Sequence, residues 1–262
     1  MLRIASLHIY PVKACAGVDL EVMNLDDRGP TGDRRYMIVD PEGRFVTQRE
    51  SPMMALIQPS LLPTGLRMQA PGRAPLTVQP GEDRRPVRVW ASELEAIDAG
   101  DPAAQWLSSI LDRPVRLVSM APEVRRAIDP PHEEGPTSVA FADGFPLLVT
   151  HTSSLRELNE RLERPVTMGR FRANIVVDGG VPWEEDQWSG LRIGATEIRL
   201  PKPCERCKVI TVDPETGQTS KEPLRTLATY RCVTGAGVIF GQNGIHAGPA
   251  TIAVGDRVEL LV

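Results

Sequence analysis

The sequence predicts a mixed α+β protein that is rich in β-structure and carries few helices. Short runs of β-branched and apolar residues recur through the first hundred residues, and Pro and Gly separate them. Helical patterns are short and few. The chain has 262 residues, which is enough for a large core shared between two subdomains.

The first hundred residues contain closely spaced candidate strands. Each run is short, and turn residues such as Pro41, Gly43, Pro80 and Gly81 lie between neighbouring runs. This spacing favours a barrel or a sandwich. The expected strands cover residues 4–10, 35–39, 44–48, 66–70, 76–79, 87–90 and 94–97.

Three helices are expected. Residues 101–111 carry Asp101 as a candidate N-cap and Pro102 at the first helical position, followed by an apolar stripe. In the second, residues 154–162, Ser154 and Glu157 have the spacing of a capping box. The third covers residues 223–230.

Strands return in the second half of the chain. The segment 121–136 is rich in proline and charge, so we expect it to connect two domains, residues 1–120 and 121–262. The later expected strands cover residues 174–177, 198–200, 209–212, 238–240 and 258–262.

Composition narrows the classes of function. Hydrophobic residues make up 41% of the chain and charged residues 24%, as in ordinary globular proteins. A net charge of −4 gives no basic footprint for nucleic acid. No apolar run is long enough for a membrane span, and four cysteines are too few for a disulfide scaffold. We therefore expect a cytoplasmic protein that binds neither membrane nor nucleic acid.

The segment Cys204-Glu205-Arg206-Cys207 is the most informative in the chain. The residues after it, 209–212, are mostly β-branched, and 213–217 have the composition of a turn. We therefore expect the cysteines at the entrance of a strand rather than at the helix start that is typical of redox dithiols. Structural zinc, a redox dithiol, inert buried thiols and a thiolate that ligates another soft metal centre all remain open.

Cations recur at the edges of the expected strands. Lys13, Arg34, Arg49 and Arg172 each lie beside one, where several could converge on one anionic ligand. Sequence spacing does not show such convergence, and surface charge explains each residue separately. His151 precedes the second expected helix, and the acidic run 184–186 is typical of a solvated loop.

Four motifs occur in order along the chain. They are Ile9-Tyr10-Pro11-Val12-Lys13, Phe45-Val46-Thr47-Gln48-Arg49, Phe171-Arg172-Ala173-Asn174, and the block from Cys204 through Cys207 to Gly217. Together they resemble the MOSC proteins that carry a MOSC N-terminal β-barrel domain, the group of the amidoxime-reducing components. The resemblance spans nearly the whole chain and implies an N-terminal β-barrel-like domain, a MOSC β-barrel domain and a few peripheral helices.

The resemblance implies a molybdenum cofactor, which is a pterin with a dithiolene and a phosphate. Cys207 would ligate the molybdenum as the catalytic residue. Lys13, Arg34 and Arg172 match positions that hold the pterin and its phosphate. Further cofactor contacts would come from Asn174, Thr47, Arg49 and Asp213.

Some positions depart from the family pattern. Ala14 stands where serine is frequent, which removes one hydrogen bond to the cofactor, and Ala173 stands where proline is common. Some members carry a ferredoxin domain, but no cysteines follow Cys232, so we expect no iron–sulfur cluster in this chain. The resemblance also carries a family-level link to pyridoxal phosphate.

Three hypotheses follow. The first is a molybdenum oxidoreductase that reduces N-hydroxylated small molecules with electrons from a separate flavoprotein, ferredoxin or cytochrome-type protein. The second is a sulfur carrier or cofactor-handling protein in which Cys207 holds a persulfide. The third is a non-catalytic binding module whose thiols are structural.

Overall fold

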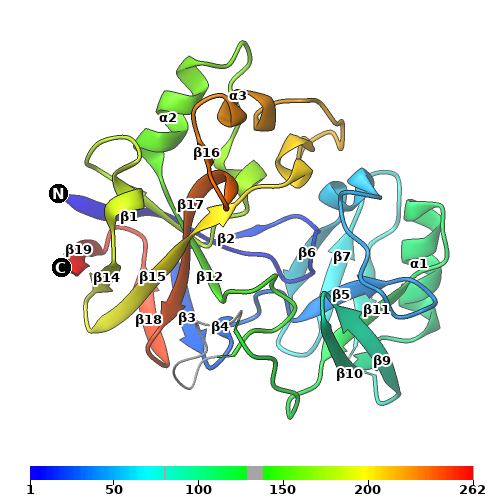
Figure 1. Ribbon diagram of the computed structural model, residues 1–262. Coiled ribbons are helices and arrows are strands. Elements are labelled where there is room, and N and C mark those ends of the chain that lie inside the picture. The colour runs from blue at the N-terminus through cyan, green and yellow to red at the C-terminus, as the bar shows by residue number, and fades with distance from the viewer. Residues whose placement is uncertain (80, 129–137, 262) are drawn as a thin grey trace.

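The computed structural model describes residues 1–79, 81–128 and 138–261 (Figure 1). A closed barrel of seven strands forms the larger lobe. Around the barrel the strands follow the order β12 (Leu147–His151), β13 (Ile175–Asp178), β1 (Leu2–Ile9), β19 (Arg257–Leu261), β14 (Gly190–Ile193), β15 (Thr196–Glu205) and β17 (Gly237–His246).

The barrel closes because β17 also pairs with β12. Its core is a cluster of aliphatic side chains with Trp188, and Leu2, Ile4, Leu7 and Ile9 bring β1 into it. The predicted boundary near residue 120 stays a prediction, but β1 pairs with β13 and β19. The first strand of the chain thus completes a barrel that is otherwise built from residues after 146.

Short strands extend the larger lobe. β2 (Val18–Leu20) pairs with β1, and β16 (Cys232–Val233) pairs with β17. A separate three-stranded sheet joins β18 (Ala250–Ala253), β3 (Val22–Asp26) and β4 (Gly29–Pro30). The helices α2 (Thr152–Glu160) and α3 (Leu224–Ala228) lie above the barrel in Figure 1.

A smaller lobe, built from residues 36–120, lies beside the barrel (Figure 1). Its sheets form a half-barrel. One sheet joins β5 (Tyr36–Val39), β11 (Arg116–Met120), β10 (Ser92–Asp98) and β9 (Arg84–Val89). The other joins β6 (Gln58–Leu61), β7 (Leu66–Gln69) and β8 (Leu76–Val78), and α1 (Asp101–Leu111) covers the outer side.

The strand β5 is buried on both faces. Tyr36 and Ile38 pack into the cluster beneath α1, whereas Met37 and Val39 pack into a cluster with Phe141 on the other side of the sheet. Alternation of side chains along a strand explains this division. This packing fixes the chain before and after β5. Arg34 lies just before the strand, and Thr47 and Arg49 follow it in the chain.

The β-rich class with few helices is confirmed. Two predicted strands are wrong. Residues 44–48 make only isolated bridges, at Arg44 and Phe45. Residues 209–212 belong largely to the 3-10 helix η4 (Lys208–Thr211), because Ile210 packs against Phe171 and Phe240 and that packing overrides β-propensity.

The position of the cysteine pair relative to the strands therefore differs from the prediction. Strand β15 ends at Glu205, so Cys204 is its penultimate residue and Cys207 is the N-cap of η4. The pair therefore lies at the exit of a strand and not at an entrance. Each cysteine still sits on or beside a rigid element.

The ends of the helices also differ from expectation. Gly100, not Asp101, is the N-cap of α1. The cap of α2 is His151, whose ring Nδ1 accepts a hydrogen bond from the backbone N–H of Ser153, so the predicted capping box is wrong. The connection 121–136 lies partly outside the described residues.

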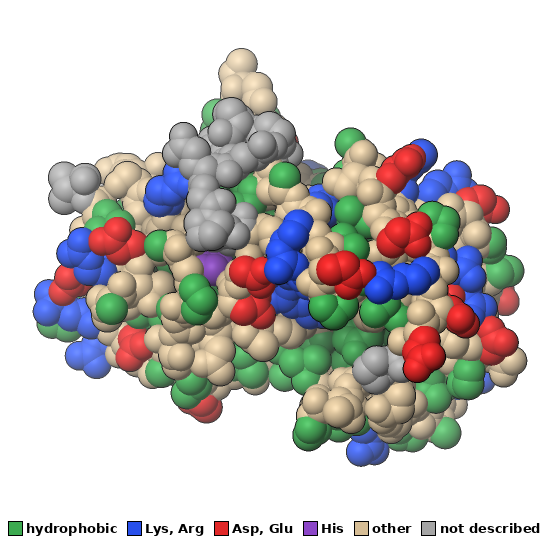
Figure 2. Space-filling model, turned by 90° about the horizontal axis from the view of Figure 1, so that it is seen from below, with side chains coloured by type: hydrophobic (Ala, Val, Ile, Leu, Met, Phe, Trp, Pro, Cys, Tyr) green, Lys and Arg blue, Asp and Glu red, His purple; other side chains and the backbone are tan. Residues whose placement is uncertain are grey.

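The surface carries both signs of charge. Figure 2 shows Lys and Arg side chains interspersed with Asp and Glu on the face seen from below. Within the described parts of the chain, no helix has the length and apolar character needed to cross a membrane.

Candidate functional site

A cavity of about 420 Å³ opens where the two lobes meet, and we call it the seam cavity. Most of the predicted site residues line it, although they come from segments far apart in the chain. Asp213 is the exception and does not line it. The predicted residues that the seam cavity brings together are Lys13, Arg34, Thr47, Arg49, Arg172, Asn174 and Cys207.

Two arginines stack on one tyrosine at this cavity. The guanidinium carbons of Arg34 and Arg172 lie 4.6 Å and 4.2 Å from the centroid of the Tyr10 ring. Burial raises the pKa of Tyr10 to about 12, so its hydroxyl stays neutral and donates to the carbonyl of Ala173 at 3.2 Å. The Tyr10 ring thus holds two like charges close together.

Arg172 retains hydrogen-bonding capacity. Its Nη1 donates to the carbonyl of Cys15 at 2.6 Å, whereas Nη2 is buried and has no partner among the described residues. Burial, followed by repulsion from Arg34, lowers the pKa of Arg172 to about 10. A buried cation with an unsatisfied donor is costly, and an anionic ligand would relieve that cost.

Asn174 is a framework residue. Its Oδ1 accepts from Arg34 Nη1 and from the backbone N–H of Leu148, both at 3.1 Å. Its Nδ2 donates to the carbonyl of His8 at 3.1 Å and to Asp33 Oδ1 at 3.3 Å. These four bonds fill the capacity of the amide, so Asn174 positions Arg34 between β1 and β12.

Asp33 also holds Arg34, through the same nitrogen that Asn174 contacts. Its Nη1 lies 2.6 Å from Asp33 Oδ2. Burial would lower the pKa of Arg34, but the pairing with Asp33 more than offsets it, so the pKa is raised. The guanidinium is therefore charged and fixed in place before any ligand arrives.

Lys13 is buried with 6% of its surface exposed. Its ammonium donates to the carbonyl of Phe141 at 2.7 Å and to the carboxylate of Asp143 at 2.5 Å. Burial lowers its pKa, and Asp143 opposes that effect. An ammonium has three donors, and the described residues supply acceptors for two of them, so one is left for a ligand.

Arg49 stands where the smaller lobe meets the cavity. The hydroxyl of Thr47 accepts from the backbone N–H of Arg49 at 3.2 Å and from its Nε at 3.4 Å. The guanidinium carbon lies 4.9 Å from a ring centroid of Trp90. Thr47 thus orients Arg49, and Trp90 is a site residue that sequence reasoning missed.

The two cysteines have different surroundings. Cys204 is half-buried, and its Sγ accepts from Arg206 Nη1 at 2.9 Å. Cys207 is exposed, and neither forms a disulfide. In the described residues, no group of three or more Cys, His, Asp or Glu side chains could hold a metal.

Backbone strain gathers at the seam cavity. Ala14, Arg34, Trp90 and Arg172 have φ values of 67°, 46°, 54° and 58°, in the left-handed region that non-glycine residues rarely adopt. Such conformations cost about 1–3 kcal/mol each and persist where the surrounding structure enforces them, most often at functional sites. No sequence pattern indicated them.

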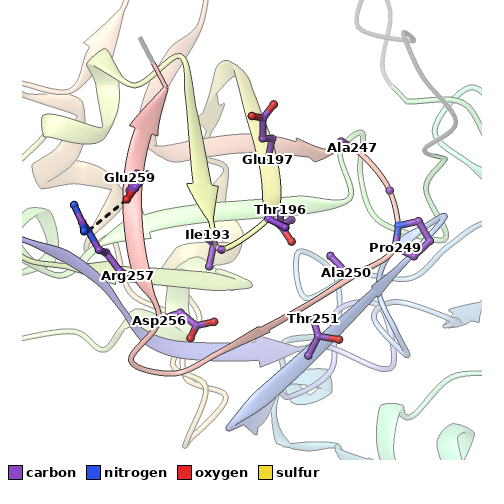
Figure 3. A pocket seen from close by; sticks show the side chains of 13 residues that line it. Ile193, Thr196, Glu197, Ala247, Pro249, Ala250, Thr251, Asp256, Arg257 and Glu259 are labelled. Atoms are coloured by element: carbon purple, nitrogen blue, oxygen red, sulfur yellow. Dashed lines mark ion pairs between the residues drawn. The ribbon is translucent and has the colours of Figure 1, made fainter.

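A larger cavity, of about 680 Å³, shares no residue with the seam cavity. Figure 3 shows it between the turn that joins β14 to β15 and the start of β18. Its described charged groups include Arg257 and Glu259, whose side chains pair at 3.6 Å. None of the residues that line it is a cysteine or an aromatic residue, so its size does not indicate a site of similar chemistry.

Two known protein families match two successive parts of the chain. Residues 1–114 match the MOSC N-terminal beta barrel domain, and residues 136–259 match the MOSC domain. The second match contains the segments of Arg172, Asn174 and Cys207, and the first contains those of Lys13, Arg34, Thr47 and Arg49. The seam cavity thus takes residues from both matched regions.

Curated relatives match over nearly the full length. The chain is 36% identical to human mitochondrial amidoxime-reducing component 1, over 98% of this chain and 82% of the relative. It is 34% identical to bovine mitochondrial amidoxime reducing component 2, over 87% of this chain and 72% of the relative. Among solved structures, the YUAD protein of Bacillus subtilis aligns with 98% of this chain and 94% of its own chain. Its sequence identity is 11% and the TM-score is 0.44, so the likeness is too weak to assign a function. The chain therefore belongs to the MOSC family, with a MOSC N-terminal beta barrel domain preceding the MOSC domain.

Proposed function

We propose that this protein binds a molybdenum cofactor in the seam cavity and reduces N-hydroxylated small molecules. The observation that carries the proposal is the meeting of an exposed thiol, Cys207, with the buried cations Lys13 and Arg172 in one cavity. The relatives named as amidoxime-reducing components, at up to 36% identity, support the type of reaction.

The residues present fit such a cofactor. Cys207 is a thiol of the kind that soft metals prefer. Arg172 Nη2 and the third donor of Lys13 suit the anionic phosphate end. Ala14 provides no hydroxyl, which leaves the backbone and the cations to satisfy the ligand there.

In this proposal, side chains of the protein bind the cofactor and orient it in the seam cavity. When bound, the molybdenum centre supplies the two-electron reduction of an N–O bond. Arg34, fixed by Asp33 and Asn174, and Arg49, fixed by Thr47, present charge without the cost of ordering flexible side chains. The electrons come from a separate donor protein of flavoprotein, ferredoxin or cytochrome type.

The test is metal analysis of protein produced in cells that make the molybdenum cofactor. Wild type is compared with Cys207→Ala, and Cys232→Ala serves as a control because Cys232 is also an exposed, free thiol but does not line the seam cavity. We expect molybdenum near one per chain in wild type and in the control. Cys207→Ala should lose the metal and all reduction of benzamidoxime while unfolding at the same temperature.

Other outcomes would assign other functions. Releasable sulfur on Cys207 without molybdenum would favour the sulfur-carrier hypothesis. Stoichiometric zinc in place of molybdenum would give the thiols a structural role. Cytoplasmic localisation and the link to pyridoxal phosphate stay predictions.

A further inference from the structure

A second cavity, of about 630 Å³, opens beside the seam cavity, and we call it the side cavity. Its volume suits a drug-sized molecule. The two cavities share a boundary, so a molecule in the side cavity would lie next to a cofactor in the seam cavity. The shared residues include Trp90, Asp143, Phe145, Cys204, Glu205 and Asn243.

Two carboxylates stand on this boundary, and only one is engaged by hydrogen bonds. Asp143 accepts from the Lys13 ammonium at 2.5 Å and from Trp90 Nε1 at 3.1 Å. Within the described residues, no donor reaches the carboxylate of Glu205. Lys202 Nζ lies 3.9 Å from Glu205 Oε1, which exceeds hydrogen-bond distance, and 56% of the Glu205 side chain is exposed.

The backbone of Glu205 is fixed although its side chain is exposed. Glu205 ends β15, and its backbone is in register with Ile239 of β17. The next residue, Arg206, directs its guanidinium to Cys204 Sγ and to the carbonyl of Phe171. Arg206 is therefore occupied elsewhere. Among the described residues the Glu205 carboxylate has only the 3.9 Å ion pair with Lys202, which leaves its hydrogen-bond acceptors available to a molecule in the side cavity.

The proposed reaction changes the charge of its substrate. An amidoxime is neutral, and its reduction takes two electrons from the donor protein and two protons. The N–O bond breaks, the oxygen leaves as water, and an amidine remains. The amidine is strongly basic and takes up a further proton from water, so a cation appears where the substrate was neutral.

We propose that Glu205 recognises the amidine group of substrates held in the side cavity and favours substrates whose reduction produces a cation. This rests on the proposed function. The carboxylate accepts hydrogen bonds from the amidine N–H groups, and its attraction grows as positive charge develops. Trp90 and Phe145 supply aromatic surface on the same boundary for a planar substituent.

The first test measures binding and needs no turnover. Benzamidine and benzamide have similar shape, but only benzamidine is a cation. Calorimetry on the molybdenum-loaded protein should show tighter binding of benzamidine. Because Glu205 is partly exposed, we expect Glu205→Gln to weaken benzamidine binding by about fivefold and to leave benzamide unchanged.

Two variants serve as controls. Glu205→Asp keeps the charge and should retain most of the preference for benzamidine. Glu197→Gln removes a carboxylate of similar exposure from the other end of β15, which lines the larger cavity of Figure 3, and should change nothing. Equal benzamidine binding by wild type and Glu205→Gln would overturn the proposal.

The second test compares two substrates. Benzamidoxime yields a cationic product, whereas benzohydroxamic acid yields neutral benzamide. Glu205→Gln should lower kcat/KM about fivefold for benzamidoxime and less than twofold for the hydroxamic acid. If loaded wild type reduces neither compound, the proposed function fails; if it reduces both and Glu205→Gln affects them equally, only the role of Glu205 fails.

Discussion

The seam cavity and the polar cluster beneath α2 both bury polar atoms without partners, yet they differ in what surrounds those atoms. Among the residues that the structure describes, the unpaired atoms at the seam cavity are Arg172 Nη2 and Arg206 Nε. The residues His151, Ser154, Glu185 and Trp188 form a cluster that we call the α2 cluster. Its atoms without a partner in the described part of the chain are His151 Nε2, Glu185 Oε1 and Trp188 Nε1.

The difference lies in space and in charge. Arg172 and Arg206 line a cavity together with other cations, whereas no residue of the α2 cluster lines a cavity described above. In the α2 cluster, burial lowers the pKa of His151 and raises that of Glu185, so both groups tend to neutrality. Unpaired buried atoms thus indicate a ligand only where there is room for one and its charge is complementary.

The largest expected effect tests the α2 cluster. Burial raises the pKa of Glu185 to about 7 from its ordinary 4.5, and its hydrogen bond from Ser154 opposes that shift only in part. The unfolded chain releases this proton near pH 4.5, while the folded protein holds it until about pH 7. The free energy of unfolding therefore falls across that window as pH rises, by up to about 3 kcal/mol.

Glu185→Gln removes this dependence. We expect the variant to gain stability relative to wild type between pH 5 and pH 8, measured by urea unfolding at each pH. Comparison at each pH cancels the opposite contribution of His151. Glu163→Gln, at an exposed position, is the control and should follow wild type. A constant difference between Glu185→Gln and wild type would show that Glu185 does not titrate in this range.

The next effect tests the seam cavity. Arg172→Ala removes a guanidinium with an unsatisfied buried donor, so cofactor retention during dialysis should weaken by about 10–100-fold. Arg161→Ala is a matched control, because Arg161 also lies 4.2 Å from a tyrosine ring centroid, that of Tyr230, but outside the cavity. Equal retention in the two variants would remove Arg172 from the cofactor site.

Sequence patterns located much of the fold but not its distant contacts. The α1 segment was predicted with its observed bounds, because Pro102 and the apolar stripe are local signals. The strand predicted at 209–212 was wrong because Ile210 packs against Phe171 and Phe240, which are distant in the chain. Burial of Glu185 was missed for the same reason, since an acidic run gives no sign of the helix that will cover it.

Contacts between distant residues also limited what the sequence could predict about the seam cavity. Spacing gave no reason for Lys13, Arg34 and Arg172 to meet, and only the family resemblance brought them together in advance. The structure adds groups that no motif marked. Trp90 combines a left-handed backbone with stacking on Arg49, and Asp143 pairs with Lys13.

The smallest expected effect concerns Asp213, the predicted site residue that does not line the seam cavity. Its Oδ1 accepts from the backbone N–H groups of Glu215 and Thr216, at 2.9 Å and 3.1 Å, and its Oδ2 pairs with Arg170 at 2.8 Å. Asp213→Ala should therefore lower the free energy of unfolding by about 1 kcal/mol. Asp213→Asn, which keeps an acceptor for the turn, should lose less.

Cofactor retention decides what Asp213 does. If the carboxylate only holds the turn after η4, both variants should retain molybdenum within twofold of wild type in the dialysis assay used for Arg172→Ala. Arg170, its partner, is two residues from Arg172, so a shift of this segment could reach the cavity. Loss of retention in Asp213→Ala, with recovery in Asp213→Asn, would mean that the turn positions Arg172. Loss in both would make the charge of Asp213 part of the cofactor site, as the resemblance implies.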